Sequence, residues 1–119
     1  MRFPSDSPIT RAKLDALRER IERLGIDLDA VGERFVKASG PGGQKVNKTQ
    51  SGVQLSYAPL SIIVKWTRER SRALNRFLAL RELVDEIEIV ESPETSSRLR
   101  ERERIKKQKD RRRRRGRRG

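Results

Sequence analysis

The sequence predicts an α+β fold: a small antiparallel sheet with packed helices, followed by a basic tail. Two observations support this fold class. A hairpin pattern of alternating apolar residues lies near the middle of the chain, and segments with helical apolar spacing lie on either side of it. Hydrophobic residues make up only 33% of the chain and charged residues 39%, which indicates that part of it stays unfolded. The 119 residues allow one small domain with a modest core.

A first helix is predicted from Pro8 to Leu24, within an N-terminal helical segment of residues 1–25. Ser7 is the expected N-cap, and Pro8 suits the first helical position. Gly25 suits the left-handed residue that follows a helix. The apolar residues recur at helical spacing: Leu14, Leu17, Ile21 and Leu24. We expect this stripe to pack on the domain or to form a lid.

Three strands are predicted after this helix. Residues 33–37 form a strand that leads into a glycine-rich loop, in which residues 46–49 form a single helical turn. The second strand alternates apolar and polar residues, and its buried face carries Val53, Leu55 and Tyr57. A proline-containing turn at residues 58–61 joins it to residues 62–66, the returning strand of a hairpin.

A second long helix is predicted from Arg72 to Glu88, with Ser71 as its N-cap. Its wide apolar face is suited to covering a sheet and consists of Leu74, Phe77, Leu78, Leu80, Val84 and Ile87. Ser92-Pro93 ends the predicted ordered part. The predicted central domain is therefore residues 26–91, and residues 92–119 are expected to be a flexible basic tail.

The net charge of +13 is concentrated in this tail. Residues 98–119 contain 14 Lys and Arg against 3 Asp and Glu, a net of +11, whereas residues 1–97 carry a net of +2. Because no apolar face accompanies the charge, it predicts a nucleic-acid partner rather than a membrane. We expect residues 98–104 to be transiently helical and residues 111–119 to be disordered in the free chain. The candidate RNA-binding residues of the tail are Lys106, Lys107, Lys109, Arg111, Arg112, Arg113, Arg114, Arg115, Arg117 and Arg118.

The chain contains no cysteine and no histidine, which narrows the possible chemistry. Disulfides, thiolate or histidine metal sites, cysteine nucleophiles and Ser-His-Asp triads are excluded. We expect no metal and no cofactor. No apolar run approaches the roughly 20 residues that span a bilayer, and no signal-peptide core is visible at the N-terminus. We therefore expect a cytoplasmic protein that does not associate with membranes.

The loop of residues 39–49 carries the strongest functional signal. Its glycines Gly40, Gly42 and Gly43 permit unusual backbone angles and close approach, and Gln44 is the first large polar side chain after them. Such a loop presents backbone N–H groups and one amide to a nearby group. Taken alone, the pattern also fits a flexible loop or a phosphate-binding nest of N–H groups.

The longer string from Phe35 to Thr49 resembles the catalytic GGQ region of class I peptide-chain release factors. The resemblance continues through Ser51-Gly52-Val53, residues 62–64, and Arg70-Ser71 with Asn75, and covers residues 28–90. Two positions depart from the family pattern. Lys45 stands where many relatives carry histidine, and Arg72 stands where glutamine is common. Neither departure changes the two glycines or the glutamine.

The resemblance implies that the loop enters the peptidyl-transferase centre of the large ribosomal subunit and promotes hydrolysis of P-site peptidyl-tRNA. Gly42 and Gly43 would permit the backbone shape, and the main-chain N–H of Gln44 would donate to the oxyanion. The Gln44 side chain would confine the nucleophile to water, and a methyltransferase would modify it to N5-methylglutamine. Proton transfer would come from the terminal adenosine of the tRNA. Lys45, Lys48 and Arg70 are the candidate RNA contacts outside the tail.

A loop domain with a basic tail and no decoding domain resembles the stand-alone rescue factors, namely the ArfB (YaeJ) type and the related mitochondrial factors. Pro93-Glu94-Thr95 matches a codon-reading tripeptide by coincidence, because it follows the catalytic domain. The resemblance predicts a monomeric, codon-independent hydrolase that rescues stalled ribosomes. The tail would either sense an empty mRNA channel of the small subunit or tether the chain to rRNA.

Two other functions stay open at this point. The same hydrolysis could act on split large subunits or on damaged ribosomes. The short tail and the additional first helix favour this alternative. The fold could also serve a non-catalytic rRNA-binding protein.

Overall fold

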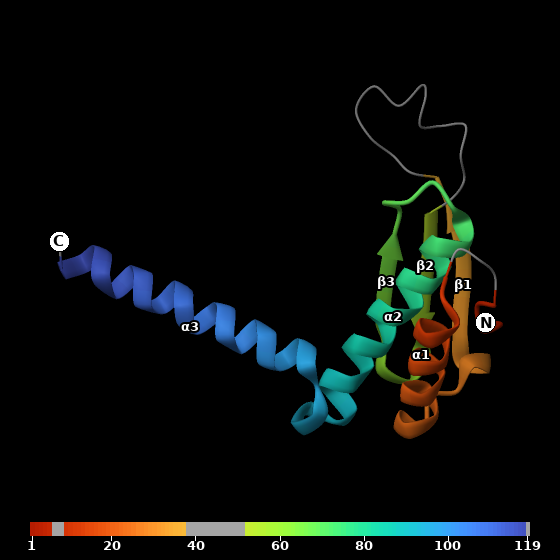
Figure 1. Ribbon diagram of the computed structural model, residues 1–119, viewed down its shortest axis with the longest axis horizontal. Helices are drawn as coiled ribbons and strands as arrows, with labels where there is room; N and C mark the ends of the chain where they lie inside the picture. Colours follow the sequence, from red (N-terminus) through yellow and green to blue (C-terminus); the bar gives the residue numbers. More distant parts are fainter. Residues whose placement is uncertain (6–8, 38–51, 119) are drawn as a thin grey trace.

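A three-stranded antiparallel sheet forms the centre of the molecule (Figure 1). The computed structural model describes residues 1–5, 9–37 and 52–118. The strands β1 (Val31–Val36), β2 (Gly52–Tyr57) and β3 (Ile62–Trp66) lie in the order β1-β2-β3. A short 3-10 helix, Ala58–Leu60, makes the predicted turn between β2 and β3. The three predicted strands are confirmed, although β1 begins before residue 33.

One face of the sheet is buried. Val53 and Leu55 of β2 are 0% exposed, and Tyr57 is 8% exposed, so the predicted inward face of this strand is confirmed. The register places Val31 opposite Tyr57 and Val64 opposite Leu55, which extends the buried face onto both outer strands. Since side chains alternate along a strand, the residues between these positions lie on the opposite face of the sheet.

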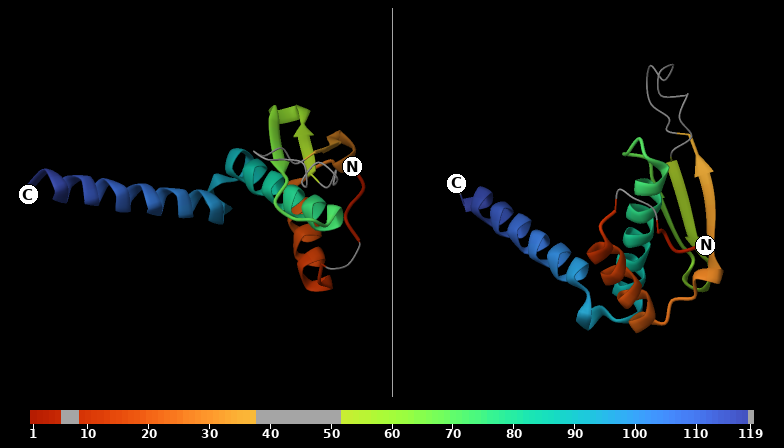
Figure 2. Two further views of the ribbon diagram at one scale, coloured as in Figure 1. Left: turned by 90° about the horizontal axis from the view of Figure 1, so that it is seen from above. Right: turned by 45° about the vertical axis from the view of Figure 1, so that its right-hand side comes forward.

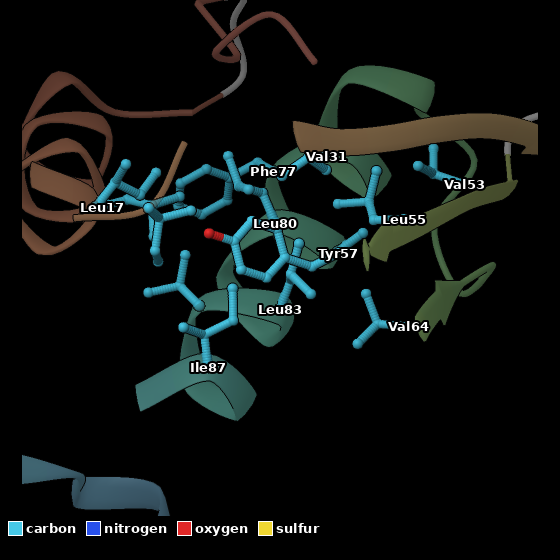
Figure 3. Close-up of a cluster of buried hydrophobic side chains, with 14 residues drawn as sticks. Leu17, Val31, Val53, Leu55, Tyr57, Val64, Phe77, Leu80, Leu83 and Ile87 are labelled. Carbon is cyan, nitrogen blue, oxygen red and sulfur yellow. The ribbon is translucent and has the colours of Figure 1, made fainter. Parts of the chain in front are cut away.

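Helix α2 (Arg72–Glu91) packs across the buried face (Figure 3). Its first turn is capped as predicted, because the Oγ of Ser71 accepts a hydrogen bond from the N–H of Leu74 at 3.2 Å. Leu80, Leu83 and Val84 are 0% exposed and Ile87 is 1% exposed, so this helix supplies the largest part of the core. The helix continues three residues beyond the predicted end at Glu88.

Helix α1 (Arg11–Leu24) lies against α2 (Figure 2). Leu17 and Ile21 are buried there, so the expectation that the stripe packs on the domain is confirmed. The predicted helix start at Pro8 is wrong: Thr10 has extended backbone angles, and its side chain accepts from the N–H of Lys13 at 3.4 Å. Gly25 has the predicted left-handed conformation, with φ 67°. Ser7 and Pro8 lie outside the described residues.

The tail contradicts the prediction of disorder, because residues Ser97–Arg118 form helix α3. Pro93 does not end the folded part. It begins a 3-10 helix, Pro93–Thr95, that turns the chain between α2 and α3. Buried Ser96 caps α3, since its Oγ accepts from the N–H of Leu99 at 3.0 Å. The helix projects away from the body (Figure 1), and none of the described helices is long and apolar enough to cross a membrane.

The predicted fold class, α+β with helices packed on a small antiparallel sheet, is confirmed. The division into residues 1–25, 26–91 and 92–119 stays a prediction.

Candidate functional site

The predicted catalytic residues Gly42, Gly43 and Gln44 lie outside the described residues, as do Lys45 and Lys48 and the predicted turn of residues 46–49. The structure instead describes how both ends of their segment are held. Val36, the last residue of β1, pairs with Gly52, the first residue of β2. The intervening chain therefore leaves and re-enters the fold at one end of the sheet (Figure 1). We call this end the loop root and define it by Phe35, Val36, Gly52, Val53 and Trp66.

Gly52 makes the close packing of the loop root possible. A Cβ at this position would lie 2.7 Å from the carbonyl oxygen of Val36 and 2.8 Å from the Cγ2 of Thr67. The first of these contacts is with backbone and cannot be relieved by a side-chain rotation. Only glycine therefore allows β1 and β2 to approach at the loop root without displacing the strand.

Two arginine–aromatic contacts flank the loop root. The register aligns Phe35, Val53 and Trp66 in one row across the three strands. The guanidinium of Arg72 lies 4.2 Å from the ring centroid of Phe35, and that of Arg68 lies 4.9 Å from a ring of Trp66. Each outer strand thus carries an aromatic ring with a stacked cation. Arg72, one of the two departures from the family pattern, contacts the ring of Phe35 in this structure.

A buried amide holds the connector between β3 and α2, residues 67–71. Asn75 is 0% exposed. Its Oδ1 accepts from the N–H of Glu69 at 3.0 Å, and its Nδ2 donates to the carbonyl of the same residue at 2.8 Å. Both bonds are between neutral groups and satisfy buried polar atoms. Only the family resemblance pointed to Asn75, because a single asparagine in a helix carries no signal of its own.

The residues around the loop root carry mostly positive charge. Arg70, a predicted RNA-binding residue, is exposed on the connector beside the N-terminal end of α2. Arg68 and Arg72 lie in the same segment, and Lys37 follows β1 at the same end of the sheet. The N-terminus of α2 adds the partial positive charge of a helix dipole. Residues 67–71 contain one carboxylate, that of Glu69. This end of the molecule therefore suits an anionic partner.

A second anchor at β1 was not predicted. The Nε of Arg76 on α2 donates to the Oε2 of Glu33 on β1 at 2.7 Å, and one of its terminal nitrogens donates to the carbonyl of Arg2 at 2.8 Å. Both side chains of the ion pair are less than one-fifth exposed. Arg76 thus joins the N-terminal residues, β1 and α2. The alternation of β1 places Glu33 on the helix-covered face, but its partner could not be read from sequence.

The tail begins at the opposite end of the sheet from the loop root (Figure 1). There a network of ion pairs, the α2–α3 junction, joins α1, α2 and α3. Arg98 of α3 contacts Glu82 at 3.0 Å and Asp85 at 2.6 Å, and Arg102 pairs with Glu86. Glu88, 3% exposed, accepts from Arg20, Arg23 and Thr95 at 2.7, 3.2 and 2.7 Å. These carboxylates give α3 its direction.

The pKa values in the junction follow from its pairing. Burial acts to raise the pKa of Glu88, but hydrogen bonds from Arg20, Thr95 and Arg23 outweigh it and place the pKa below its ordinary value. Burial acts to lower the pKa of Arg20, and its bonds to Glu88 and Asp85 raise it overall. For Arg98, the bond to Glu82 is the main cause of a raised pKa. These shifts favour the charged forms of Glu88, Arg20 and Arg98 near neutral pH.

The predicted tail residues lie beyond this junction. The predicted RNA-binding residues that are exposed on α3 are Lys106, Lys107, Lys109, Arg111, Arg112, Arg113, Arg114 and Arg115. Arg117 and Arg118 belong to the last turn of the helix. The structure does not bring these cations near the loop root. The molecule therefore offers two separate basic regions, one at each end.

Within the described ranges the site contains no self-sufficient catalytic group. No cluster of three or more potential metal-binding side chains occurs among the described residues. Histidine and cysteine are absent from the sequence. The loop root can position a loop and attract an anion, and the chemistry it supports is positioning and charge stabilisation.

Comparison with known proteins identifies the family. The model of the RF-1 domain matches residues 19–118. The human protein named mitochondrial translation release factor in rescue is 34% identical over 88 residues, covering 74% of this chain and 53% of that protein. Its zebrafish (Danio rerio) counterpart is 38% identical over 81 residues, covering 68% and 52%. Peptide chain release factor 1 of Treponema pallidum (strain Nichols) is 36% identical over 96 residues, covering 78% and 27%.

The chain spans about half the length of the two rescue relatives and a smaller share of the bacterial release factor. The matched region includes the loop root, the connector with Asn75, the whole of α2 and the α2–α3 junction. The resemblance inferred from the glycine-rich loop is confirmed, and the chain belongs to the RF-1 domain family.

Proposed function

We propose that this chain hydrolyses peptidyl-tRNA on the ribosome, independently of codons, and thereby rescues stalled ribosomes. The observation that carries the proposal is an intact Gly42-Gly43-Gln44 sequence inside a matched RF-1 domain. Two relatives are named mitochondrial translation release factor in rescue, which favours ribosome rescue over stop-codon reading. The substrate is the ester that joins the peptide to P-site tRNA.

The mechanism we infer relies on positioning. The loop root fixes both ends of the catalytic segment, and the two glycines let its backbone approach the ester. The main-chain N–H of Gln44 stabilises the oxyanion, a contribution worth about 10²–10³-fold in rate in comparable sites. The Gln44 side chain excludes nucleophiles larger than water and is the proposed site of N5-methylation. With no histidine or cysteine in the chain, the proton relay belongs to the tRNA.

A single-turnover release assay on nonstop complexes tests the catalytic assignment. Gly42→Ala and Gln44→Ala are expected to lower the release rate at least about 100-fold. The control is Gly116→Ala on α3, where an added Cβ meets nothing within 4 Å, and it should release at the wild-type rate. Full activity in Gly42→Ala would refute the assignment. Ribosome binding without release by the wild type would favour the non-catalytic alternative.

For α3 we propose binding to ribosomal RNA through its exposed cations, either in the mRNA channel of the small subunit or on rRNA elsewhere. A chain truncated after Arg104 keeps Arg98 and Arg102 in the junction and removes the basic residues beyond it. A matched variant replaces the tail lysines and arginines from residue 106 onward by glutamine, which keeps a similar helix propensity. Both variants should lose rescue activity at physiological salt. Equal activity in the wild type and the two variants would show that the tail has no role in the mechanism.

A second candidate keeps the chemistry and changes the substrate to peptidyl-tRNA on separated large subunits. The helical form of the tail favours it, because 22 helical residues span about 33 Å, less than half their extended reach. Comparing release from intact nonstop ribosomes with release from isolated large subunits separates the two candidates.

A further inference from the structure

The face of the sheet opposite α2 is not covered by any helix among the described residues (Figure 2). Both α1 and α2 lie on the other side, where the core is. Strand alternation assigns the open face to Gly32, Arg34 and Val36 of β1, to Gly52, Gln54 and Ser56 of β2, and to Ile63 and Lys65 of β3.

One row of this face is cationic across the sheet. Arg34 pairs in register with Gln54, and Gln54 pairs with Lys65, so two cations flank a central amide. Arg34 and Lys65 are both exposed, and Gln54 is half-buried. Neighbouring strands lie about 4.8 Å apart, which places the backbones of Arg34 and Lys65 roughly 10 Å from each other. Long flexible side chains can converge from that separation onto one phosphate or spread over two.

These two cations differ from three arginines on the helix side of the sheet. Arg20, Arg76 and Arg98 all form ion pairs with carboxylates. Neither Arg34 nor Lys65 forms an ion pair with any residue that the structure describes, and the open face contains no aspartate or glutamate. Lys65 lines a pocket at the edge of β3 together with Glu82 and Glu86 but forms no ion pair with these or other described residues, so both cations can contact an anionic partner. The row lies one residue from Phe35, Val53 and Trp66 of the loop root, about 3.4 Å along the strands.

We propose that the Arg34–Gln54–Lys65 row is a second RNA-binding surface, which grips the phosphate backbone of large-subunit ribosomal RNA beside the catalytic loop. The proposal rests on the proposed function for the identity of the RNA. The small residues Gly32 and Ser56 in the neighbouring row keep the surface flat, so a backbone can approach it closely. Ile63, 66% exposed, offers an apolar contact to a ribose. The row orients the domain, whereas α3 binds at a distance.

The test measures binding of the full chain to vacant large ribosomal subunits at several potassium chloride concentrations, with no peptidyl-tRNA present. The variant is Arg34→Gln with Lys65→Gln. The matched control is Arg11→Gln with Lys13→Gln, which removes two exposed cations of α1. Each lost phosphate contact lowers the slope of log affinity against log salt by about 0.7–0.9, so the sheet variant should lower it by roughly 1.5. Its affinity at about 0.1 M salt should fall at least about tenfold, and the control should bind as the wild type does.

Three results would overturn the proposal. Equal losses in the two variants would mean that only the total charge matters. Loss of affinity with an unchanged salt slope would indicate a protein contact in place of RNA. If the sheet variant binds as tightly as the wild type, the open face has no role in binding. The proposed function would still stand in that case, provided that the wild type releases peptide. Conversely, salt-dependent binding through the row in a wild-type chain that releases no peptide would support the RNA surface and refute the catalytic assignment.

Discussion

The loop root and the α2–α3 junction are held together by different kinds of interaction. The first holds the two ends of the predicted catalytic segment, and the second holds helix α3. At the loop root, Gly52 brings two backbones into contact and Asn75 fixes the connector through neutral hydrogen bonds. At the junction, Glu88 and Arg98 belong to a network of ion pairs. Neutral contacts respond little to salt and pH, whereas ion pairs respond to both. The fold thus combines a close-packed attachment for the predicted catalytic segment with a helix whose direction depends on charge.

The largest expected effect is at Gly52. Gly52→Ala places a methyl group 2.7 Å from the carbonyl oxygen of Val36 and should lower the free energy of unfolding by about 3 kcal/mol. Denaturant unfolding measures this loss. Gly116→Ala in the open environment of α3 is the control and should change the same quantity by less than about 0.5 kcal/mol. Equal stability of the two variants would mean that the loop root tolerates displacement.

Asn75→Ala should have the next largest effect. It removes both hydrogen bonds to Glu69 and should lower the free energy of unfolding by about 2 kcal/mol. If the proposed function holds, the release rate should fall in the same variant, because the connector beside the loop root loses its hydrogen-bonded anchor. Gln108→Ala, which removes an exposed amide from α3, serves as the control for both measurements. A stability loss without any loss of release would separate the connector from catalysis.

Glu88→Gln tests the junction and should lower the free energy of unfolding by about 1–2 kcal/mol, since its arginine partners are partly exposed. The pKa of Glu88 is lower in the folded than in the unfolded chain, so its contribution is complete above the unfolded pKa. That contribution is lost as pH falls through the folded pKa. Unfolding measured across the acid range should therefore be less pH-dependent in Glu88→Gln than in the wild type, and exposed Glu91→Gln should behave as the wild type.

The smallest expected effect concerns the direction of α3. Arg98→Gln with Arg102→Gln should change the free energy of unfolding by less than about 1 kcal/mol, as partly exposed ion pairs do. The distance distribution between spin labels at Ala58→Cys and Gln108→Cys should nevertheless broaden, and high salt should broaden it in the wild type. The chain has no native cysteine to interfere. Arg100→Gln with Lys106→Gln removes the same charge and should leave the distribution narrow.

Local patterns predicted most of the fold. The alternation at Val53, Leu55 and Tyr57 is a property of two or three neighbouring positions, and Ser71 begins a helix through its own hydroxyl. Thr10 shows the limit of such reasoning, because Ser7 and Thr10 are both acceptable caps and the sequence favoured the wrong one.

Two features could not be read locally because their partners are distant in sequence. Glu88 is 68 residues from Arg20, and a lone glutamate on a helix gives no sign that it is buried. The prediction of a disordered tail failed for the same reason. It rested on the low-complexity composition of the tail, which gives no sign of the carboxylates on α2 that pair with Arg98 and Arg102.

Periodicity, caps and a contiguous motif were enough to predict the strands, the two packed helices and the family. Only the three-dimensional structure showed which residues hold the two ends of the predicted catalytic segment, where α3 points, and that two cations lie in one row on the open face of the sheet. These properties depend on strand register and on pairs of residues far apart in the chain, and no contiguous pattern records them.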